Sequence, residues 1–196
     1  MIPPKIVALY GSPRRTGNTA TLLKQAVEGA RQAGAQVTEI VLRDYKISPC
    51  LEIYNCIKTG ECAIRDDFPG ILEKIEACDG IMLASPIFFY TVSAHTKIFM
   101  DRCQSLWVRK YWIEKQKFGA GEGRRKGLFI SVGATKGKKL FDGALLTVKY
   151  FFDVVDVSDW EKLLCRGLDF KGEANKNPAY LDAARTAGKN LAQALI

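Results

Sequence analysis

A polar loop, Gly11–Thr19, constrains this chain more than any other feature of its sequence. It directly follows an apolar run at residues 5–10 and precedes a long helical pattern, which predicts a strand, a tight loop and a helix N-terminus in succession. The first helical turn leaves backbone N–H groups unsatisfied, and the helix dipole adds partial positive charge there. Because the loop, Gly-Ser-Pro-Arg-Arg-Thr-Gly-Asn-Thr, also carries hydroxyl, amide and guanidinium groups, it is typical of a phosphate-binding site.

The composition of this loop indicates which kind of phosphate it would bind. The loop lacks the Gly-Lys-Ser/Thr ending of a P-loop, and it lacks the G-x-G-x-x-G spacing of a dinucleotide site. A compact, hydroxyl-rich loop instead suits a phosphate monoester such as that of FMN. The alternative is an ordinary strand-to-helix turn in which Gly and Ser only cap the helix.

Strand and helix patterns alternate along the rest of the chain with little spare sequence. Five βα units of this length predict an open parallel sheet with helices on both faces, in strand order 2-1-3-4-5, within a single domain spanning residues 1–196. Ligands of such sheets bind at the carboxyl ends of the strands, where the loops 11–18, 85–93 and 133–138 would converge. We expect strands at about 5–10, 36–42, 80–84, 126–132 and within 153–164, and helices at about 19–33, 67–77, 94–106, 139–152 and 178–195.

Charge and hydropathy narrow the classes of protein to which this chain can belong. Lys and Arg number 29 against 21 Asp and Glu, a formal net charge of +8. The basic surplus would suit nucleic acid or a phosphorylated nicotinamide, but no nucleic-acid fold signature accompanies it, so we expect a basic surface around an anionic ligand and no nucleic-acid partner. No apolar run is long enough for a spanning helix and no signal peptide precedes the first strand, so we expect no membrane insertion and a cytoplasmic location.

The loop Ser85–Ser93 is unusually apolar for its position directly after a buried strand. Four of its side chains, those of Ile87, Phe88, Phe89 and Tyr90, are large and apolar or aromatic. A loop there is normally polar unless it covers something flat and apolar, such as an isoalloxazine ring. Alternatively, these side chains fill the end of the sheet or an oligomer interface.

Together, these motifs resemble those of the NADPH-dependent FMN reductase and iron–sulfur flavoprotein group, within the flavodoxin-like fold, a three-layer sandwich. The resemblance rests on Gly-Ser-Pro-Arg-x-x-Gly-Asn-Thr, on Ser-Pro-Ile-Phe-Phe from residue 85, and on Lys97-x-Phe99-x-Asp101-Arg102. It implies that the FMN phosphate is bound by Ser12, Arg14, Gly17, Asn18 and Thr19. It implies that the flavin ring is flanked by Pro86, Ile87, Phe88 and Phe89, with Gly133 and Ala134 closing its other side.

Three cysteines decide between the branches of this group. Cys50, Cys56 and Cys62 resemble the segment that binds a [4Fe–4S] cluster in iron–sulfur flavoproteins, where four cysteines are spaced C-x2-C-x2-C-x5-C. Ile53 stands at the second of these positions, and an isoleucine cannot coordinate iron. We therefore expect a flavin-only protein in preference to one with a [4Fe–4S] cluster, which would need an outside ligand, or with zinc. Whether the three thiols bind any metal stays open. The remaining cysteines, Cys78, Cys103 and Cys165, lie in apolar patterns typical of a core.

The expected function is an FMN-dependent NAD(P)H oxidoreductase that passes hydride through the flavin to a quinone, a free flavin or a similar small acceptor. NADPH or NADH would be the co-substrate, and no catalytic side chain is expected because the flavin supplies the chemistry. The alternatives are an iron–sulfur flavoprotein, a flavodoxin-type electron carrier and a non-enzymatic nucleic-acid-binding module. The aromatic and basic stretch Trp107–Trp112 could stack on a nicotinamide or cover the flavin of a partner subunit, but a role in an interface or in packing is favoured. Exposed aromatic loops favour a homodimer or homotetramer.

Overall fold

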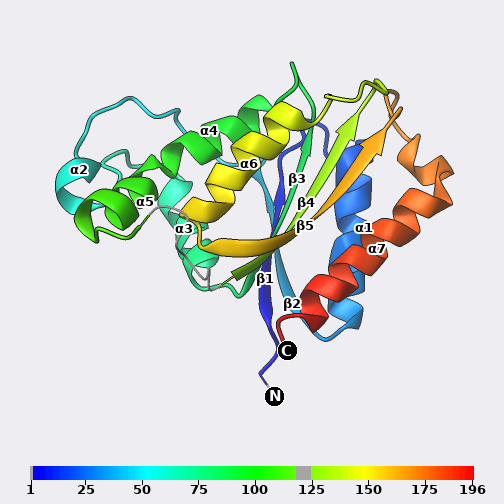
Figure 1. Cartoon of the computed structure of the whole chain (residues 1–196), viewed down its shortest axis with the longest axis horizontal. Coiled ribbons are helices and arrows are strands. Elements are labelled where there is room, and N and C mark those ends of the chain that lie inside the picture. The colour runs from blue at the N-terminus through cyan, green and yellow to red at the C-terminus, as the bar shows by residue number, and fades with distance from the viewer. Residues whose placement is uncertain (1, 118–124) are drawn as a thin grey trace.

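The computed structural model describes residues 2–117 and 125–196 and is organised around one parallel sheet. The strand order is β2-β1-β3-β4-β5, and every neighbouring pair is parallel (Figure 1). The predicted flavodoxin-like sheet is thereby confirmed. The strands are β1 (Lys5–Tyr10), β2 (Gln36–Val41), β3 (Gly80–Pro86), β4 (Arg125–Gly133) and β5 (Val157–Arg166).

Helices cover both faces of this sheet. The helices α1 and α7 lie on one face, and α3, α4 and α6 lie on the other (Figure 1). The helices are α1 (Asn18–Gln32), α2 (Cys56–Thr59), α3 (Phe68–Glu76), α4 (Ala94–Arg102), α5 (Gln104–Val108), α6 (Asp142–Val154) and α7 (Pro178–Gln193). Shorter helical turns are η1 (Leu42–Asp44), the π-helical η2 (Arg109–Ile113) and η3 (Ala174–Lys176).

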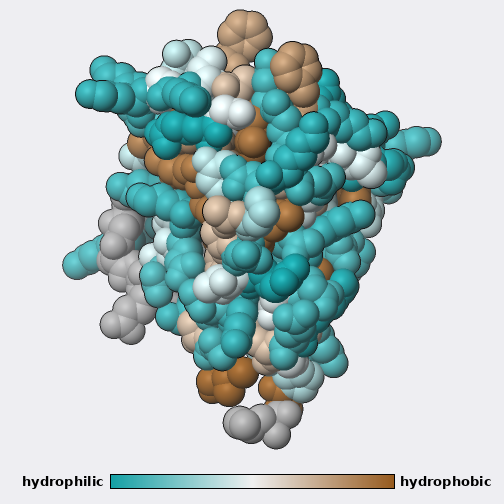
Figure 2. All heavy atoms as spheres, turned by 90° about the vertical axis from the view of Figure 1, so that its right-hand side faces the viewer, coloured by the Kyte–Doolittle hydropathy of each residue, from teal (hydrophilic) through white to brown (hydrophobic). Residues whose placement is uncertain are grey.

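The two faces of the sheet have separate cores, because successive side chains of a strand point to opposite sides. In β1, Ile6 and Ala8 pack under α1 and α7, whereas Val7 and Leu9 pack under the other helical layer. The outer surface over α1 and α7 is largely hydrophilic, and apolar side chains protrude at its upper end (Figure 2). In Figure 1, the strands β3, β4 and β5 finish at that same end. No helix among residues 2–117 and 125–196 is long and apolar enough to cross a membrane.

The structure corrects several predicted boundaries. The helix expected at 94–106 is divided at Cys103 into α4 and α5 and continues into η2. The helix expected from 139 begins at Asp142, and β3 and β5 extend to Pro86 and Arg166. The short helix α2 in the cysteine segment was not predicted, because its four residues are too few to show a helical period.

Candidate functional site

The predicted phosphate loop connects β1 to an uncapped helix N-terminus. Gly17, directly before α1, is extended, no side chain caps the helix, and its first turn holds no acidic residue. The carbonyl of Gly17 accepts the N–H of Thr21 at 3.0 Å, so the preceding N–H groups of the helix have no partner within it. An uncapped, positively polarised helix start is a suitable place for an anion.

The two arginines of this loop differ in their surroundings. Arg15 forms an ion pair with Asp44 of η1 at 2.6 Å. Within residues 2–117 and 125–196, the guanidinium of Arg14 has no ion-pair partner, while its backbone N–H donates to the Oγ of buried Ser12 at 3.1 Å. Arg14 is therefore the loop's available cation, whereas the charge of Arg15 is already paired; the contact of Arg14 with a phosphate stays a prediction.

Gly11 brings the phosphate loop against the start of α4. A Cβ at this position would lie 1.9 Å from Oγ1 of Thr96 and 2.9 Å from the carbonyl oxygen of Ala84. The N–H of Gly11 donates to that carbonyl at 2.8 Å, and the hydroxyl of buried Ser93 donates to the carbonyl of Gly11. The backbone of Ser93 in turn donates to Ser85 Oγ at 2.9 Å. Buried hydroxyls thus connect the first two predicted loops.

The aromatic loop forms a tight hairpin. Phe88 and Thr91 exchange two backbone hydrogen bonds of 3.0 Å, and the two residues between them, Phe89 and Tyr90, have φ values of 47° and 64°. Such two-residue turns favour Asn and Gly, and a bulky residue in this left-handed conformation costs about 1–2 kcal/mol. Phe89 is fully exposed at 100%. A strained hairpin that presents an aromatic side chain to solvent is typical of a ligand or partner contact.

The third predicted loop joins the same edge of the sheet. The N–H of Ile87 donates to the carbonyl of Val132 at 2.9 Å, which places the start of the aromatic loop beside Gly133. Gly133 is buried, and a Cβ there would lie 2.6 Å from the Leu140 side chain, whereas Ala134 is exposed. As predicted, the three loops meet at one edge of the sheet. Their contact with a flavin stays a prediction.

Asn18 has a role that the sequence did not predict. Its side chain is buried; Nδ2 donates to the carbonyl of Phe170 at 2.9 Å, and Oδ1 accepts from the N–H groups of Gly172 and Ala174 at 3.1 Å each. These bonds fasten the segment after β5 to the phosphate loop. One Nδ2 hydrogen is left for the predicted phosphate contact. A bond between residues more than 150 positions apart leaves no local signal in the sequence.

The cysteine segment does not offer a complete ligand set for a [4Fe–4S] cluster. Cys50, Cys56 and Cys62 are half-buried, and Ile53 leaves the set one thiolate short of the usual four. In the described parts of the chain, no group of three His, Cys, Asp or Glu side chains could hold a metal ion. The other three cysteines are buried as predicted, and burial raises the pKa of Cys165 to about 12.

The stretch Trp107–Trp112 packs within the chain. Its ring centroids lie 5.5 Å apart for Trp107 and Tyr111, and 5.4 Å apart for Trp107 and Trp112. Buried Lys110 donates to the carbonyl of Asp153 at 2.6 Å and to Asp156 Oδ1 at 2.9 Å. These contacts agree with the favoured packing role, and Trp112 is still 47% exposed.

A five-stranded parallel sheet of this order with helices on both faces defines a flavodoxin-like fold. The family model described as NADPH-dependent FMN reductase matches residues 4–162, and the chain belongs to that family. The predicted resemblance is confirmed.

Individual relatives agree with this assignment. An iron–sulfur flavoprotein of Archaeoglobus fulgidus is 33% identical over 155 residues, which cover 78% of this chain and 75% of the relative. An iron–sulfur flavoprotein of Methanocaldococcus jannaschii is 39% identical over 102 residues, 52% of this chain, so the chain spans about half (53%) of that relative's length.

Solved structures show the same fold at low sequence identity. An NAD(P)H:quinone oxidoreductase from Methanothermobacter marburgensis is similar with a TM-score of 0.69 at 17% identity, covering 97% of this chain and 96% of that one. An FMN-dependent NADH-azoreductase from Bacillus anthracis, solved in complex with FMN, has a TM-score of 0.69 at 14% identity, covering 97% and 99%.

Proposed function

We propose that this protein is an FMN-dependent NAD(P)H oxidoreductase that reduces a small acceptor such as a quinone or a free flavin. The observation that carries the proposal is the joining of three loops at the carboxyl edge of the sheet: the uncapped start of α1, the strained hairpin after β3 and the segment after β4. The names of the relatives, which include FMN-containing and quinone-reducing enzymes, support it. We also propose a homodimer or homotetramer in which the exposed hairpin takes part.

FMN, when bound, would supply hydride chemistry, and the chain would supply binding, orientation and exclusion of water. Ser12, Arg14 and the N–H groups of α1 would hold the phosphate. The N–H groups of Ile87 and Phe88 are already bonded to the carbonyls of Val132 and Thr91. These two N–H groups are therefore not available to bind the flavin ring. We assign the orientation of the ring to the tip of the hairpin and its aromatic side chains.

Removing the available cation of the phosphate loop tests the flavin site. Arg14→Ala should weaken FMN binding about tenfold or more, because a hydrogen bond to a charged group contributes about 1.5–3 kcal/mol. Arg15→Ala is the matched control, since Arg15 is already paired with Asp44. FMN affinity is measured by quenching of flavin fluorescence. Equal affinity of wild type and Arg14→Ala would contradict the phosphate site, and absence of NAD(P)H oxidation with a quinone would contradict the reductase activity.

The iron–sulfur relatives favour a second candidate, a one-electron carrier with a cluster. Absorption spectra and iron assays on protein purified without oxygen separate the two. Flavin bands without iron support the flavin-only enzyme, whereas a broad shoulder with stoichiometric iron supports the carrier. Ile53→Cys, which restores a fourth thiolate at the motif spacing, should gain iron on anaerobic reconstitution if the missing ligand is the reason for its absence.

A further inference from the structure

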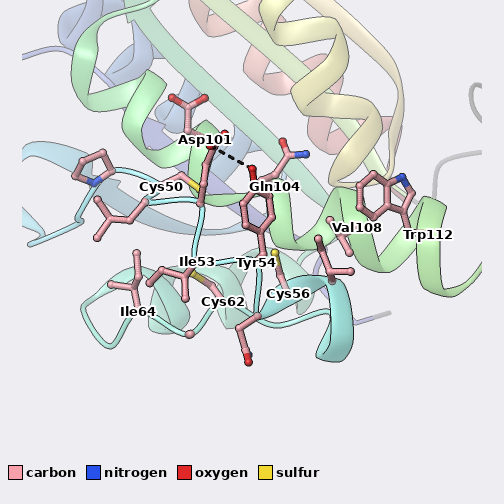
Figure 3. A pocket seen from close by; sticks show the side chains of 16 residues that line it. Cys50, Ile53, Tyr54, Cys56, Cys62, Ile64, Asp101, Gln104, Val108 and Trp112 are labelled. Carbon is pink, nitrogen blue, oxygen red and sulfur yellow. Dashed lines mark hydrogen bonds between the residues drawn. The ribbon is translucent and has the colours of Figure 1, made fainter.

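A cavity of about 490 Å³ lies in the cysteine segment, apart from the three loops of the flavin site. Its walls come from residues 49–57 and 62–64 on one side and from α4, α5 and η2 on the other (Figure 3). None of its lining residues belongs to the loops 11–18, 86–93 or 133–138. Its volume falls in the range of small-molecule sites.

The loop that forms one wall is held firmly at both ends. The side chain of Arg102 is fully buried; Nη1 donates to the carbonyl of Ser48 at 3.0 Å and forms an ion pair with Asp66 Oδ2 at 2.5 Å. Asp66 also accepts the N–H of Ser48 at 2.9 Å, and Nη2 of Arg102 donates to the carbonyl of Ile64 at 3.3 Å. Between these anchors, Glu52 and Tyr54 adopt positive φ values of 50° and 62°. The loop is thus braced at both ends and locally strained between them.

The charges of the lining differ in sign from those of the whole chain. The net charge of the chain is +8, yet the cavity is lined by two carboxylates, Glu52 and Asp101, and by no Lys or Arg. Lys97, outside the lining, pairs with Asp101 at 2.7 Å. Burial raises the pKa of the Cys56 thiol, which disfavours its anionic form. Such a lining disfavours a phosphate-bearing ligand.

The apolar groups of the cavity indicate the shape of its ligand. Tyr54 and Trp112, which are 58% and 47% exposed, provide aromatic faces, and Ile53, at 57%, adds an aliphatic one. The amide of Gln104 supplies an uncharged donor and acceptor in the same lining (Figure 3). We propose that this cavity binds an uncharged or cationic planar aromatic molecule, in the place where a fourth cluster ligand is missing. The proposal does not depend on the proposed reductase activity.

Cysteine alkylation can test this site without any redox assay. Cys50, Cys56 and Cys62 line the cavity, and buried Cys78, Cys103 and Cys165 serve as internal controls. Iodoacetamide labelling of the reduced protein is followed by mass spectrometry with three probes of similar size: neutral 2-naphthol, cationic N-methylquinolinium and anionic 2-naphthalenesulfonate. The first two probes should slow labelling of the three lining cysteines at least tenfold, and the sulfonate should not. No protection by any probe, or equal protection by the sulfonate, would overturn the proposal.

A charge variant locates the bound probe. Ile53→Arg adds a cation at an exposed position, so it should abolish protection by N-methylquinolinium and permit protection by the sulfonate. The matched control is Leu146→Arg, which should behave as wild type. Leu146 lies on α6, is 58% exposed and does not line the cavity. Loss of protection on addition of FMN would place the probe in the flavin site and overturn the assignment. Protection that depends on protein concentration without a probe would instead identify a second copy as the occupant.

Discussion

Substitution of Asn18 by alanine is the most informative perturbation of the phosphate loop. It removes one acceptor and one donor that together satisfy three main-chain groups in the segment 170–174. The N–H of Ala174 is buried, so leaving it without a partner should cost about 1–3 kcal/mol in the free energy of unfolding. The other two groups can bond to water instead, so the loss of each of their bonds should cost about 0.5–1 kcal/mol. We therefore expect a loss of about 3 kcal/mol in the free energy of unfolding.

The expected loss is large enough for direct measurement. For a chain of this size, about 3 kcal/mol corresponds to a decrease in Tm of about 6–12 °C, which thermal and urea denaturation followed by circular dichroism can measure. FMN affinity should fall as well. An unchanged Tm for Asn18→Ala would refute the reasoning, because it would mean that the three bonds contribute nothing to stability.

Two further variants separate positioning by Asn18 from direct contact with the phosphate. Glu173→Ala loosens the same segment from its other side, because Glu173 Oε2 accepts the N–H groups of Asp169 and Phe170 at 2.6 and 2.9 Å. Weaker FMN binding in Glu173→Ala indicates that the segment positions the loop. Asn18→Asp keeps an acceptor for the N–H groups of Gly172 and Ala174 but loses the donor to the carbonyl of Phe170, so it should recover only part of the stability that Asn18→Ala loses. Its added negative charge should still weaken FMN binding.

Three other substitutions test single contacts. Gly11→Ala places a Cβ against Thr96 and should lower the free energy of unfolding by about 1–3 kcal/mol; urea denaturation measures this, and Thr96→Ala in the same chain should restore part of it. Phe89→Gly should relieve the left-handed strain and raise stability by about 1 kcal/mol, yet weaken FMN binding if the hairpin contacts the ring; a loss of stability would contradict the strain. Although burial opposes ionisation, the hydrogen bonds of Asp66 to Arg102 and to backbone N–H groups lower its pKa below the usual value of about 3.9. The stability that this ionised pair provides should be complete above about pH 4 and be lost as the pH falls through the lowered pKa. Asp66→Asn should lower the free energy of unfolding by about 3 kcal/mol at pH 7. Urea titrations between pH 2.5 and 7 should also show a flatter dependence of stability on pH for this variant than for wild type.

Local patterns predicted the parts of this protein that local chemistry determines. An apolar run, a group of turn residues and a helical period follow one another directly in the sequence. They predicted the strand at 5–10, the loop Gly11–Thr19 and the helix after it. The strand order followed because short connections between parallel strands leave few topologies. The three converging loops were predictable for the same reason, since each follows a strand of the sheet.

Contacts between distant segments could not be predicted in this way. Nothing near Asn18 indicates that its amide binds the segment 170–174. Asp101 and Arg102 are neighbours in the family motif, but their ion-pair partners differ in kind. Asp101 pairs with Lys97 on the surface of the same helix, whereas Arg102 pairs with Asp66, 36 residues away, and holds a loop. The positive φ values of Phe89 and Tyr90 were also missed, because their residue types normally indicate extended backbone.

The hydrogen bonds of Asn18 to the segment 170–174 also affect when the loop Gly11–Thr19 can reach its folded conformation during synthesis. Chains emerge from the ribosome N-terminus first, at about 5–20 residues per second. The Gly11–Thr19 loop is therefore made before its partner segment, which follows more than 150 residues later. A nascent or truncated chain that ends with β5 would contain every strand of the sheet and still lack the segment that secures this loop. Completion of the loop is thus delayed until the C-terminal part of the chain has been made.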